Sequence, residues 1–287
     1  MKKTLPTLNF SLGFVIFSSL AAALQLIAAL TLLEKNCNYF PSNSWLSSLA
    51  VLCAILGAVC GTVAAYRIER QRLAKHPFFA SKIPSLFSAA GFLVLAVLFL
   101  SNTLMQGTPL TLLSTAFSLL AALYAVLSAF PSVAKKARDM LALLGFAAIL
   151  AGLLANAYFY FDTTVEMNSP LKFHVQIGLL IASLYFTGEI RFHLKRPNPR
   201  FFLVLASWTV AIGALSAPAM PLAYLAGRID RTDYAAGALA TLLIAISAAM
   251  RIYVLTHPFR VVRDDDEEEL SHADPFSQEE STGDDSL

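Results

Sequence analysis

The chain of 287 residues is 57% hydrophobic and only 14% charged, with a mean hydropathy of +0.63. Soluble domains carry roughly a quarter charged residues, so this composition excludes an ordinary soluble domain and indicates a membrane protein. The formal net charge of +2 hides a segregation, because residues 264–287 hold 11 acids and no Lys or Arg, whereas residues 1–263 carry all 21 bases. Those bases flank apolar runs, so they predict membrane topology and no nucleic-acid binding.

Eight apolar runs are long enough to cross a bilayer, which takes about 20 residues of helix. Inside the bilayer each backbone must satisfy its own hydrogen bonds, so runs of this length are helices. In chain order the predicted helices cover residues of about 8–33, 45–66, 84–105, 109–130, 140–162, 171–193, 201–226 and 233–256. The predicted fold is therefore an all-α, polytopic transmembrane bundle of eight helices over residues 1–257.

The distribution of Lys and Arg predicts the orientation of this bundle. The N-terminus, the links after the second, fourth and sixth helices and the region after Met250 hold 17 of these bases, and the remaining links hold 4. Positive charges collect on the cytoplasmic side, so we expect both termini to be cytoplasmic in a cell (plasma) membrane protein. The acid-rich segment 258–287 is expected to be a disordered cytoplasmic tail.

The spacing of four tyrosines is consistent with an internal repeat. Tyr66 and Tyr185 are offset by 119 residues, and Tyr124 and Tyr253 by 129 residues, each pair near the inner ends of helices. A four-plus-four duplication would produce parallel repeats of this kind. The alternative is that tyrosines gather at any inner membrane interface.

Small residues in the second helix predict close helix packing. Gly57 and Gly61 form a GxxxG pattern, for which internal packing is favoured over dimerisation. Cys53 and Cys60 lie seven residues apart on the same helix and are expected to pack rather than to bind metal.

The sequence carries no signature of catalysis or of a bound cofactor. It has no Walker loop, no HExxH and no GxSxG with a triad, so we expect no enzyme activity. His193 and His257 at the inner ends of two helices could be haem ligands or ordinary interfacial histidines. The interfacial interpretation is favoured, and we expect neither a cofactor nor a metal.

Glu189 stands near the end of the sixth predicted helix, where it could be an anchor at the membrane surface or an intramembrane proton or ion site. It lies about 27 Å along that helix at 1.5 Å per residue, at the cytoplasmic edge. It aligns with His193 at i+4 and Arg196 at i+7, where a carboxylate can stay ionised at modest cost. We therefore expect Glu189, His193 and Arg196 to form an interfacial ion-pair anchor.

Uncharged polar residues in the outer halves of four helices mark a candidate ligand site. In the seventh helix two prolines interrupt the backbone hydrogen-bond ladder, and broken helices of this kind line binding cavities in transporters. Free carbonyls and amide side chains would suit a neutral or zwitterionic ligand. The alternative is that the amides only cross-link helices. The candidate residues are Gln25, Asn156, Gln176, Ser216, Pro218 and Pro221.

The stretch "MNSPLKFHVQIGLLIASLYFTGEIRFHLKRPNPR" resembles a segment of uncharacterised polytopic membrane proteins of Firmicutes-type bacteria. The resemblance covers about 34 residues and implies only a bacterial cytoplasmic membrane, with no activity to transfer. The similar positions are Asn168, Ser169, Pro170, Lys172, Gln176, Tyr185, Glu189, Arg191, Pro199 and Arg200.

Two functions follow as expectations. The first is a small-molecule transport or binding protein with an outward-facing polar cavity. The second is a non-catalytic membrane component that binds a membrane or cytoplasmic protein partner through its helices or its acidic tail. The second is supported by the lack of a predicted charge near the bilayer centre, since ion-coupled carriers usually keep one. The lipid bilayer is a partner in both, and the oligomeric state is not predicted.

Overall fold

The computed structural model describes residues 5–33, 44–68, 81–166, 169–194 and 196–256, and this part of the chain is helical with no strand. Eight helical spans are long and apolar enough to cross a membrane, and the seventh consists of α9 and α10 together. The helices are α1 (Leu5–Thr31), α2 (Trp45–Arg67), α4 (Ile83–Gln106), α5 (Pro109–Ser128), α6 (Pro131–Lys136), α7 (Arg138–Phe161), α8 (Pro170–His193), α9 (Pro199–Ser216), α10 (Ala219–Leu225) and α11 (Thr232–Thr256).

Short links with specific end signals separate these helices. Gly107 ends α4 in the left-handed region, at φ 62°, where glycine meets no Cβ penalty. Thr108 then caps α5 by accepting a hydrogen bond from the Thr111 amide at 3.3 Å, and Pro109 occupies the first helical position. The tight connection makes α4 and α5 antiparallel neighbours.

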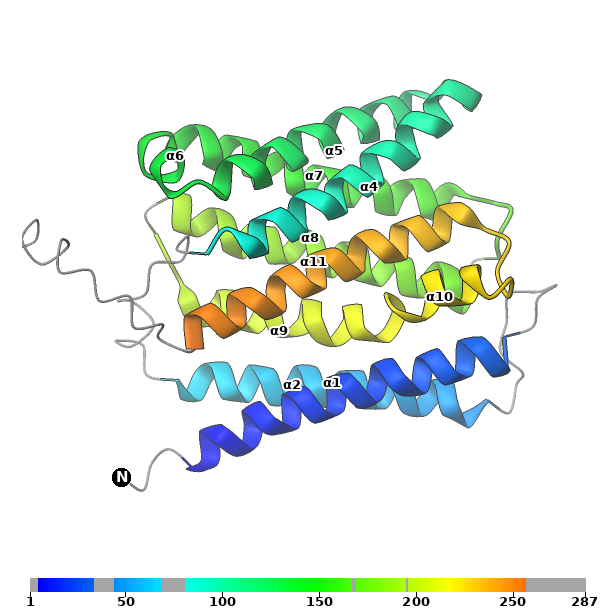
Figure 1. Cartoon of the computed structure of the whole chain (residues 1–287), viewed down its shortest axis with the longest axis horizontal. Coiled ribbons are helices and arrows are strands. Elements are labelled where there is room, and N and C mark those ends of the chain that lie inside the picture. Colours follow the sequence, from blue (N-terminus) through cyan, green and yellow to red (C-terminus); the bar gives the residue numbers. More distant parts are fainter. Residues whose placement is uncertain (1–4, 34–43, 69–80, 167–168, 195, 257–287) are drawn as a thin grey trace, which may run out of the picture. The chain divides into compact units, whose positions relative to one another are not determined.

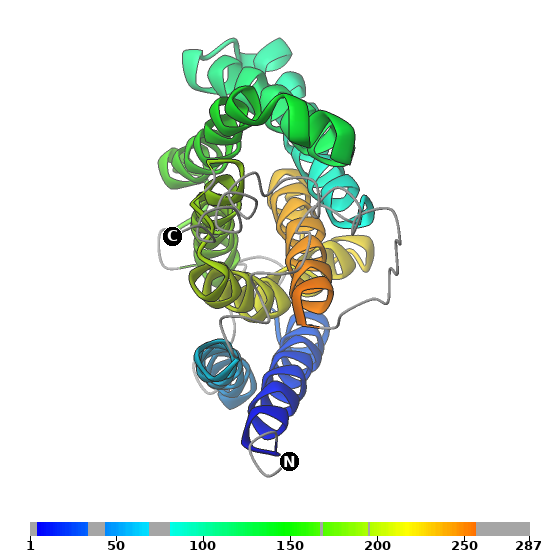
Figure 2. The same cartoon turned by 90° about the vertical axis from the view of Figure 1, so that its left-hand side faces the viewer.

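Six of the spans form a ring, in which each packs on the next in the order α4, α5, α7, α8, α9 and α11, with α11 returning to α4 (Figure 2). Helices α8 and α11 also contact each other. The pair α1 and α2 packs on α9, and α1 also packs on α10. Figure 1 shows that α1 begins and α11 ends at the same end of the bundle, which we call the terminus end; the opposite end is the far end.

Close helix approach depends on small residues at the contacts. A methyl group at Gly57 would lie 2.9 Å from Ser18 Oγ of α1, and one at Gly61 would lie 2.6 Å from Ser207 Cβ of α9. Both glycines of the GxxxG pattern therefore face other helices of the same chain. At Gly178 of α8 a methyl group would lie 2.8 Å from the Thr241 Cγ2 of α11.

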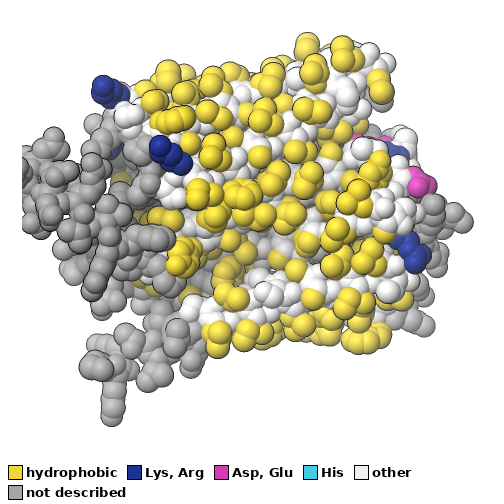
Figure 3. Space-filling view, in the orientation of Figure 1, with side chains coloured by type: hydrophobic (Ala, Val, Ile, Leu, Met, Phe, Trp, Pro, Cys, Tyr) yellow, Lys and Arg dark blue, Asp and Glu magenta, His cyan; other side chains and the backbone are white. Residues whose placement is uncertain are grey.

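The outward faces of the helices are apolar. Large hydrophobic side chains such as Val97, Leu104 and Leu143 are 67%, 80% and 72% exposed. Figure 3 shows hydrophobic side chains over the flank of the bundle, with the visible charged groups near its two ends. Faces of this kind are stable against lipid tails but not against water. Together with the eight spans they indicate a multi-pass integral membrane protein.

The seventh span is divided where the prolines predicted an interruption. Helix α9 ends at Ser216 and α10 begins at Ala219, with Pro218 between them. The expected tail, 258–287, and His257 lie outside the described residues, and the four-plus-four repeat and the side of the membrane on which the termini lie stay predictions.

Candidate functional site

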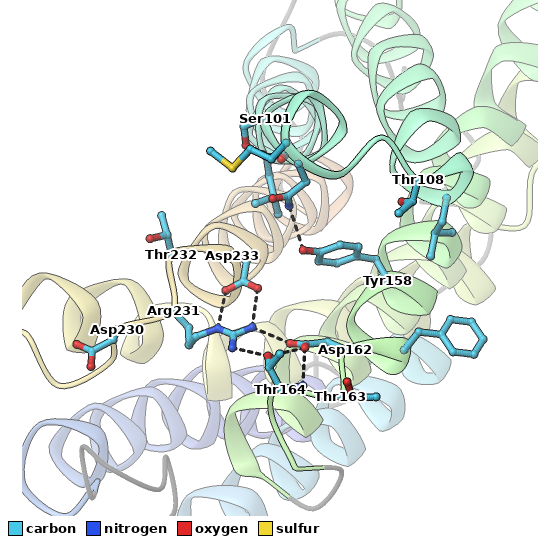
Figure 4. A pocket seen from close by; sticks show the side chains of 15 residues that line it. Ser101, Thr108, Tyr158, Asp162, Thr163, Thr164, Asp230, Arg231, Thr232 and Asp233 are labelled. Atoms are coloured by element: carbon cyan, nitrogen blue, oxygen red, sulfur yellow. Dashed lines mark hydrogen bonds and ion pairs between the residues drawn. The ribbon is translucent and has the colours of Figure 1, made fainter.

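A polar cluster joins α7 to α11 at the far end (Figure 4). Asp162 follows the last residue of α7, Arg231 immediately precedes α11, and Asp233 lies in the first turn of α11. Arg231 Nη2 donates to Asp162 Oδ2 at 2.8 Å and to Asp233 Oδ2 at 3.1 Å, and Nε donates to Asp233 Oδ1 at 3.3 Å. The side chains of Asp162 and Asp233 are only 12% and 17% exposed, so one guanidinium binds two shielded carboxylates.

Neighbouring donors fix the position of the Asp162 carboxylate. The Thr164 amide donates to Oδ1 at 2.9 Å, which closes a turn at the end of α7, and the Tyr234 hydroxyl donates to Oδ2 at 2.9 Å. Arg231 Nη1 also donates to the Thr164 hydroxyl. The carboxylate is therefore held from both the α7 side and the α11 side.

These contacts set the protonation of the cluster. Partial burial acts to raise the pKa of Asp162, but hydrogen bonds from Thr164 and Tyr234 and the charge of Arg231 outweigh it and lower that pKa below its usual value. Burial acts to lower the pKa of Arg231, and hydrogen bonding to Asp233 with the charges of Asp233 and Asp162 raises it overall. Both groups are ionised at neutral pH.

A buried lysine supports the same loop. Lys172 of α8 is 1% exposed, and its Nζ donates to the main-chain carbonyl of Asp162 at 2.6 Å and to that of Val165 at 3.4 Å. Buried cations need such acceptors, since the bare charge is costly away from water. Lys172 therefore ties the segment after α7 to the start of α8.

An open pocket of about 840 Å³ lies over the cluster, among α4, α5, α7 and the start of α11. Charged groups, hydroxyls, an amide and apolar side chains line it together. The lining residues are Leu98, Ser101, Asn102, Met105, Thr108, Leu110, Tyr158, Phe161, Asp162, Thr163, Thr164, Asp230, Arg231, Thr232 and Asp233.

One wall of the pocket is fixed by aromatic contacts. Asn102 Nδ2 donates to the Tyr158 hydroxyl at 3.0 Å, which bridges α4 and α7. The Tyr158 ring packs edge-on against Phe99, with ring centroids 5.2 Å apart. A preformed wall of this kind reduces the ordering that ligand binding would require.

None of the polar residues predicted to enclose one cavity lines the pocket at the far end. Gln25 is fully buried on α1, which packs on α2, α9 and α10 outside the ring, whereas Asn156 and Gln176 are half-buried on α7 and α8. Gln25 Oε1 accepts from the Ser47 hydroxyl of α2 at 3.2 Å, which is a helix cross-link. Spacing along a helix indicates which face a residue occupies, but which helices adjoin is decided by packing.

The remaining members of that set are also separate from the pocket. Pro218 at the break between α9 and α10 and Pro221 in the first turn of α10 are half-buried and do not line it, and the side chain of Ser216 is outside the description. Asn156 Oδ1 and Gln176 Nε2 have no hydrogen-bond partner among the described residues.

Glu189 also differs from its prediction. Its depth one turn from the end of α8 is as expected, but the side chain is 3% exposed and its charged partner is Arg251 of α11, with Oε1 3.6 Å from Nη2. Arg251 itself is 1% exposed, although the orientation count treats it as a flanking base. The interfacial anchor with Arg196 is therefore wrong in exposure and in partner, because the helical angle gives neighbours only within one helix.

Sequence reasoning missed the far-end cluster because it counted bases in the links and ignored acids. A usable signal was present, since "YFDTT" and "GRIDRTDY" place acids beside helix ends in two links assigned to the same side. For metals, the described residues contain no group of three His, Cys, Asp or Glu that could hold an ion.

The structure is therefore that of a helical membrane protein with a polar pocket at one end of its bundle. Comparison with family models, with curated proteins and with solved structures finds no match. The resemblance of residues 167–200 to Firmicutes-type membrane proteins stays a prediction.

Proposed function

We propose that this integral membrane protein binds a small, polar, neutral or zwitterionic molecule in the far-end pocket, as a binding or transport protein. The observation that carries the proposal is the pocket itself, in which Arg231, Asp162 and Asp233 are held in place at one end of the bundle. Clefts with a few fixed polar groups beside apolar walls are the usual form of small-molecule sites.

The charge arrangement favours this ligand class. Asp162 and Asp233 engage the Arg231 guanidinium from both sides, and its Nη1 also bonds Thr164, so few donors remain for an acidic ligand. Hydroxyls such as Thr108 and Thr232, and the exposed carboxylate of Asp230, offer acceptors for hydroxyl or ammonium groups. A ligand carrying amine and hydroxyl groups is complementary to this lining.

The orientation part of the proposal is that the far end faces outside the cell. It rests on the bias of Lys and Arg toward the other end, which persists when the buried Arg251 is left out of the count. The pocket would then be the outward-facing polar cavity, formed by residues other than those expected.

Ligand-induced stabilisation of the purified protein in nanodiscs tests the proposal. Amino acids, polyols, quaternary amines and dicarboxylates are compared by thermal unfolding; a ligand at 100 times its Kd stabilises by about 2.7 kcal/mol. We expect a neutral or zwitterionic compound to raise the melting temperature of the wild type and of Asp139→Asn, an exposed acid at the terminus end. Arg231→Gln and the milder Tyr158→Phe should reduce that shift.

Two results would overturn the proposal: no compound class stabilises the protein, or Arg231→Gln responds as fully as the wild type. In that case binding of a protein partner becomes the leading function. Co-purification after cross-linking in the membrane would then identify what occupies the exposed apolar face of α1, where Leu12 and Val15 are each 57% exposed.

A further inference from the structure

A second charged cluster lies inside the bundle near the terminus end. Its residues on α8 and α11 come near the ends of these helices, whereas the pocket lies at the start of α11. Four helices supply it: Ser85 from α4, Tyr124 from α5, Glu189 and Tyr185 from α8, and Arg251 from α11. All five side chains are at least nine-tenths buried. Ionisable groups inside a membrane protein are costly, and they mark functional sites by default.

The two charges are held unequally. Arg251 Nη2 donates to the Ser85 hydroxyl at 2.7 Å, whereas its distance to Glu189 Oε1 is 3.6 Å, longer than a hydrogen bond. The second oxygen, Glu189 Oε2, has no hydrogen-bond partner among the described residues. Arg251 is thus fixed to α4, whereas the negative charge of Glu189 meets Arg251 only through the longer contact.

Two tyrosine hydroxyls stand beside this carboxylate. Tyr124 and Tyr185 both interact with the Glu189 carboxylate through their hydroxyl groups. A phenol hydroxyl can donate to a carboxylate and can also accept from a carboxylic acid. The pair of tyrosines can therefore serve Glu189 in either protonation state.

The other groups packed around the cluster are an imidazole, a second arginine and an aromatic ring, and none of them is a carboxylate. His193 of α8 packs edge-on to Tyr124, with ring centroids 5.7 Å apart, and Arg138 of α7 acts on His193. From α9, Phe202 packs on the ring of Tyr185. Glu189 is therefore the carboxylate around which these groups gather.

We propose that Glu189 is a proton-exchanging carboxylate, which Arg251 and charge-assisted hydrogen bonds from Tyr124 and Tyr185 stabilise when it is ionised, and which keeps only weaker, neutral hydrogen bonds to the same tyrosines when it is protonated. A proton from solvent forms the O–H bond at Oε2, and the net charge of the Glu189–Arg251 pair changes from zero to +1. Arg251 keeps Ser85, and the Ser88–Ser247 hydrogen bond of 2.8 Å still joins α4 to α11. Proton uptake therefore removes the ionic link between α8 and α11, whereas these two contacts between α4 and α11 stay in place.

The inference is independent of the pocket ligand, and it goes beyond binding by giving the protein a way to couple proton uptake to movement of α8. Its first test is infrared difference spectroscopy of the full chain in nanodiscs during a pH titration. As pH falls, the wild type should develop the high-frequency C=O stretching band of a buried protonated carboxyl group, distinct from the band of its exposed acids. Glu189→Gln should lack that band, whereas Asp139→Asn, which removes an exposed acid near the same end, should keep it.

A second variant guards against misfolding of Glu189→Gln. The double variant Tyr124→Phe with Tyr185→Phe keeps both charges and nearly the same volume, and it removes two donors that favour the ionised form. Its band should titrate with a midpoint roughly one pH unit higher than in the wild type. A band unchanged by Glu189→Gln, or a midpoint unchanged by the double variant, would overturn the inference.

Discussion

Arg231 shows how much of the far end depends on single side chains. Its guanidinium joins Asp162, Thr164 and Asp233, so one residue connects the end of α7 with the start of α11. Such charge-assisted hydrogen bonds contribute more than exposed ion pairs, since the participating carboxylates are shielded from water. The pocket floor is therefore held together by the protein's own side chains.

At this scale we expect Asp162→Asn to destabilise the protein by about 1–3 kcal/mol, because Arg231 and Tyr234 lose a charged acceptor. The pKa of Asp162 is lowered in the folded state, so its contribution is fully present above its ordinary value of about 4 and is lost as pH falls through the lowered folded-state value. Thermal unfolding of both proteins across pH should show the difference shrinking in acid. A constant difference down to low pH would contradict the assignment.

Lys172→Met should loosen the loop after α7. The carbonyls of Asp162 and Val165 would lose their buried donor, at a cost of about 1–3 kcal/mol. Hydrogen exchange should speed up in residues 162–166, and the melting temperature should fall. Lys136→Met removes an exposed lysine from α6 and serves as the matched control, for which neither quantity should change.

Among the elements, α11 is joined to the α7–α8 hairpin at both of its ends. Arg231 binds Asp162 at the far end, and Arg251 meets Glu189 near the terminus end. Between these two ionic contacts, α8 and α11 meet through the small, uncharged residues Gly178 and Thr241. An interface with charges at both ends and small residues between them allows one end to loosen while the other holds.

The contact between α2 and α9 yields a prediction of its own. Gly61→Leu should separate these helices, since even a methyl group there would lie 2.6 Å from Ser207 Cβ. Overpacking of this kind costs about 1–3 kcal/mol, to be measured as a lower melting temperature in detergent. Val59→Leu, on the exposed face of α2, is the control. If both variants unfold like the wild type, α2 does not pack on α9 as described.

Over the whole molecule, charge and polarity are sorted by position. On the face shown in Figure 3, apolar side chains cover the flank and the visible charged groups lie near the ends. The Glu189–Arg251 pair lies buried inside the bundle. This distribution suits a bilayer whose hydrocarbon core accepts no unpaired charge.

Cysteine labelling in intact cells tests the orientation of the whole bundle. In a variant lacking Cys37, Cys53 and Cys60, Thr163→Cys at the far end should react with an impermeant thiol reagent added outside. Ser132→Cys, exposed near the terminus end, should react only after the cells are permeabilised. The reverse pattern would place the pocket on the cytoplasmic side.

The number, order and approximate bounds of the spans could be predicted from the sequence, because lipid imposes length and hydropathy on each helix separately. The break near Pro218 was likewise predictable, since proline lacks the amide that would continue the ladder. These features depend only on local residues.

Which polar groups meet was decided by the tertiary structure. Glu189 has basic neighbours on its own helix and yet pairs with Arg251, 62 positions later in the chain, and Asp162 finds Arg231 across the far end. Gln25 and Gln176, expected to share a cavity, belong to α1 and α8, which both pack on α9 but differ in their other neighbours. The periodicity of one helix fixes which face a residue occupies, but the helix that covers that face is selected by small-residue packing and charge pairing between segments distant in sequence.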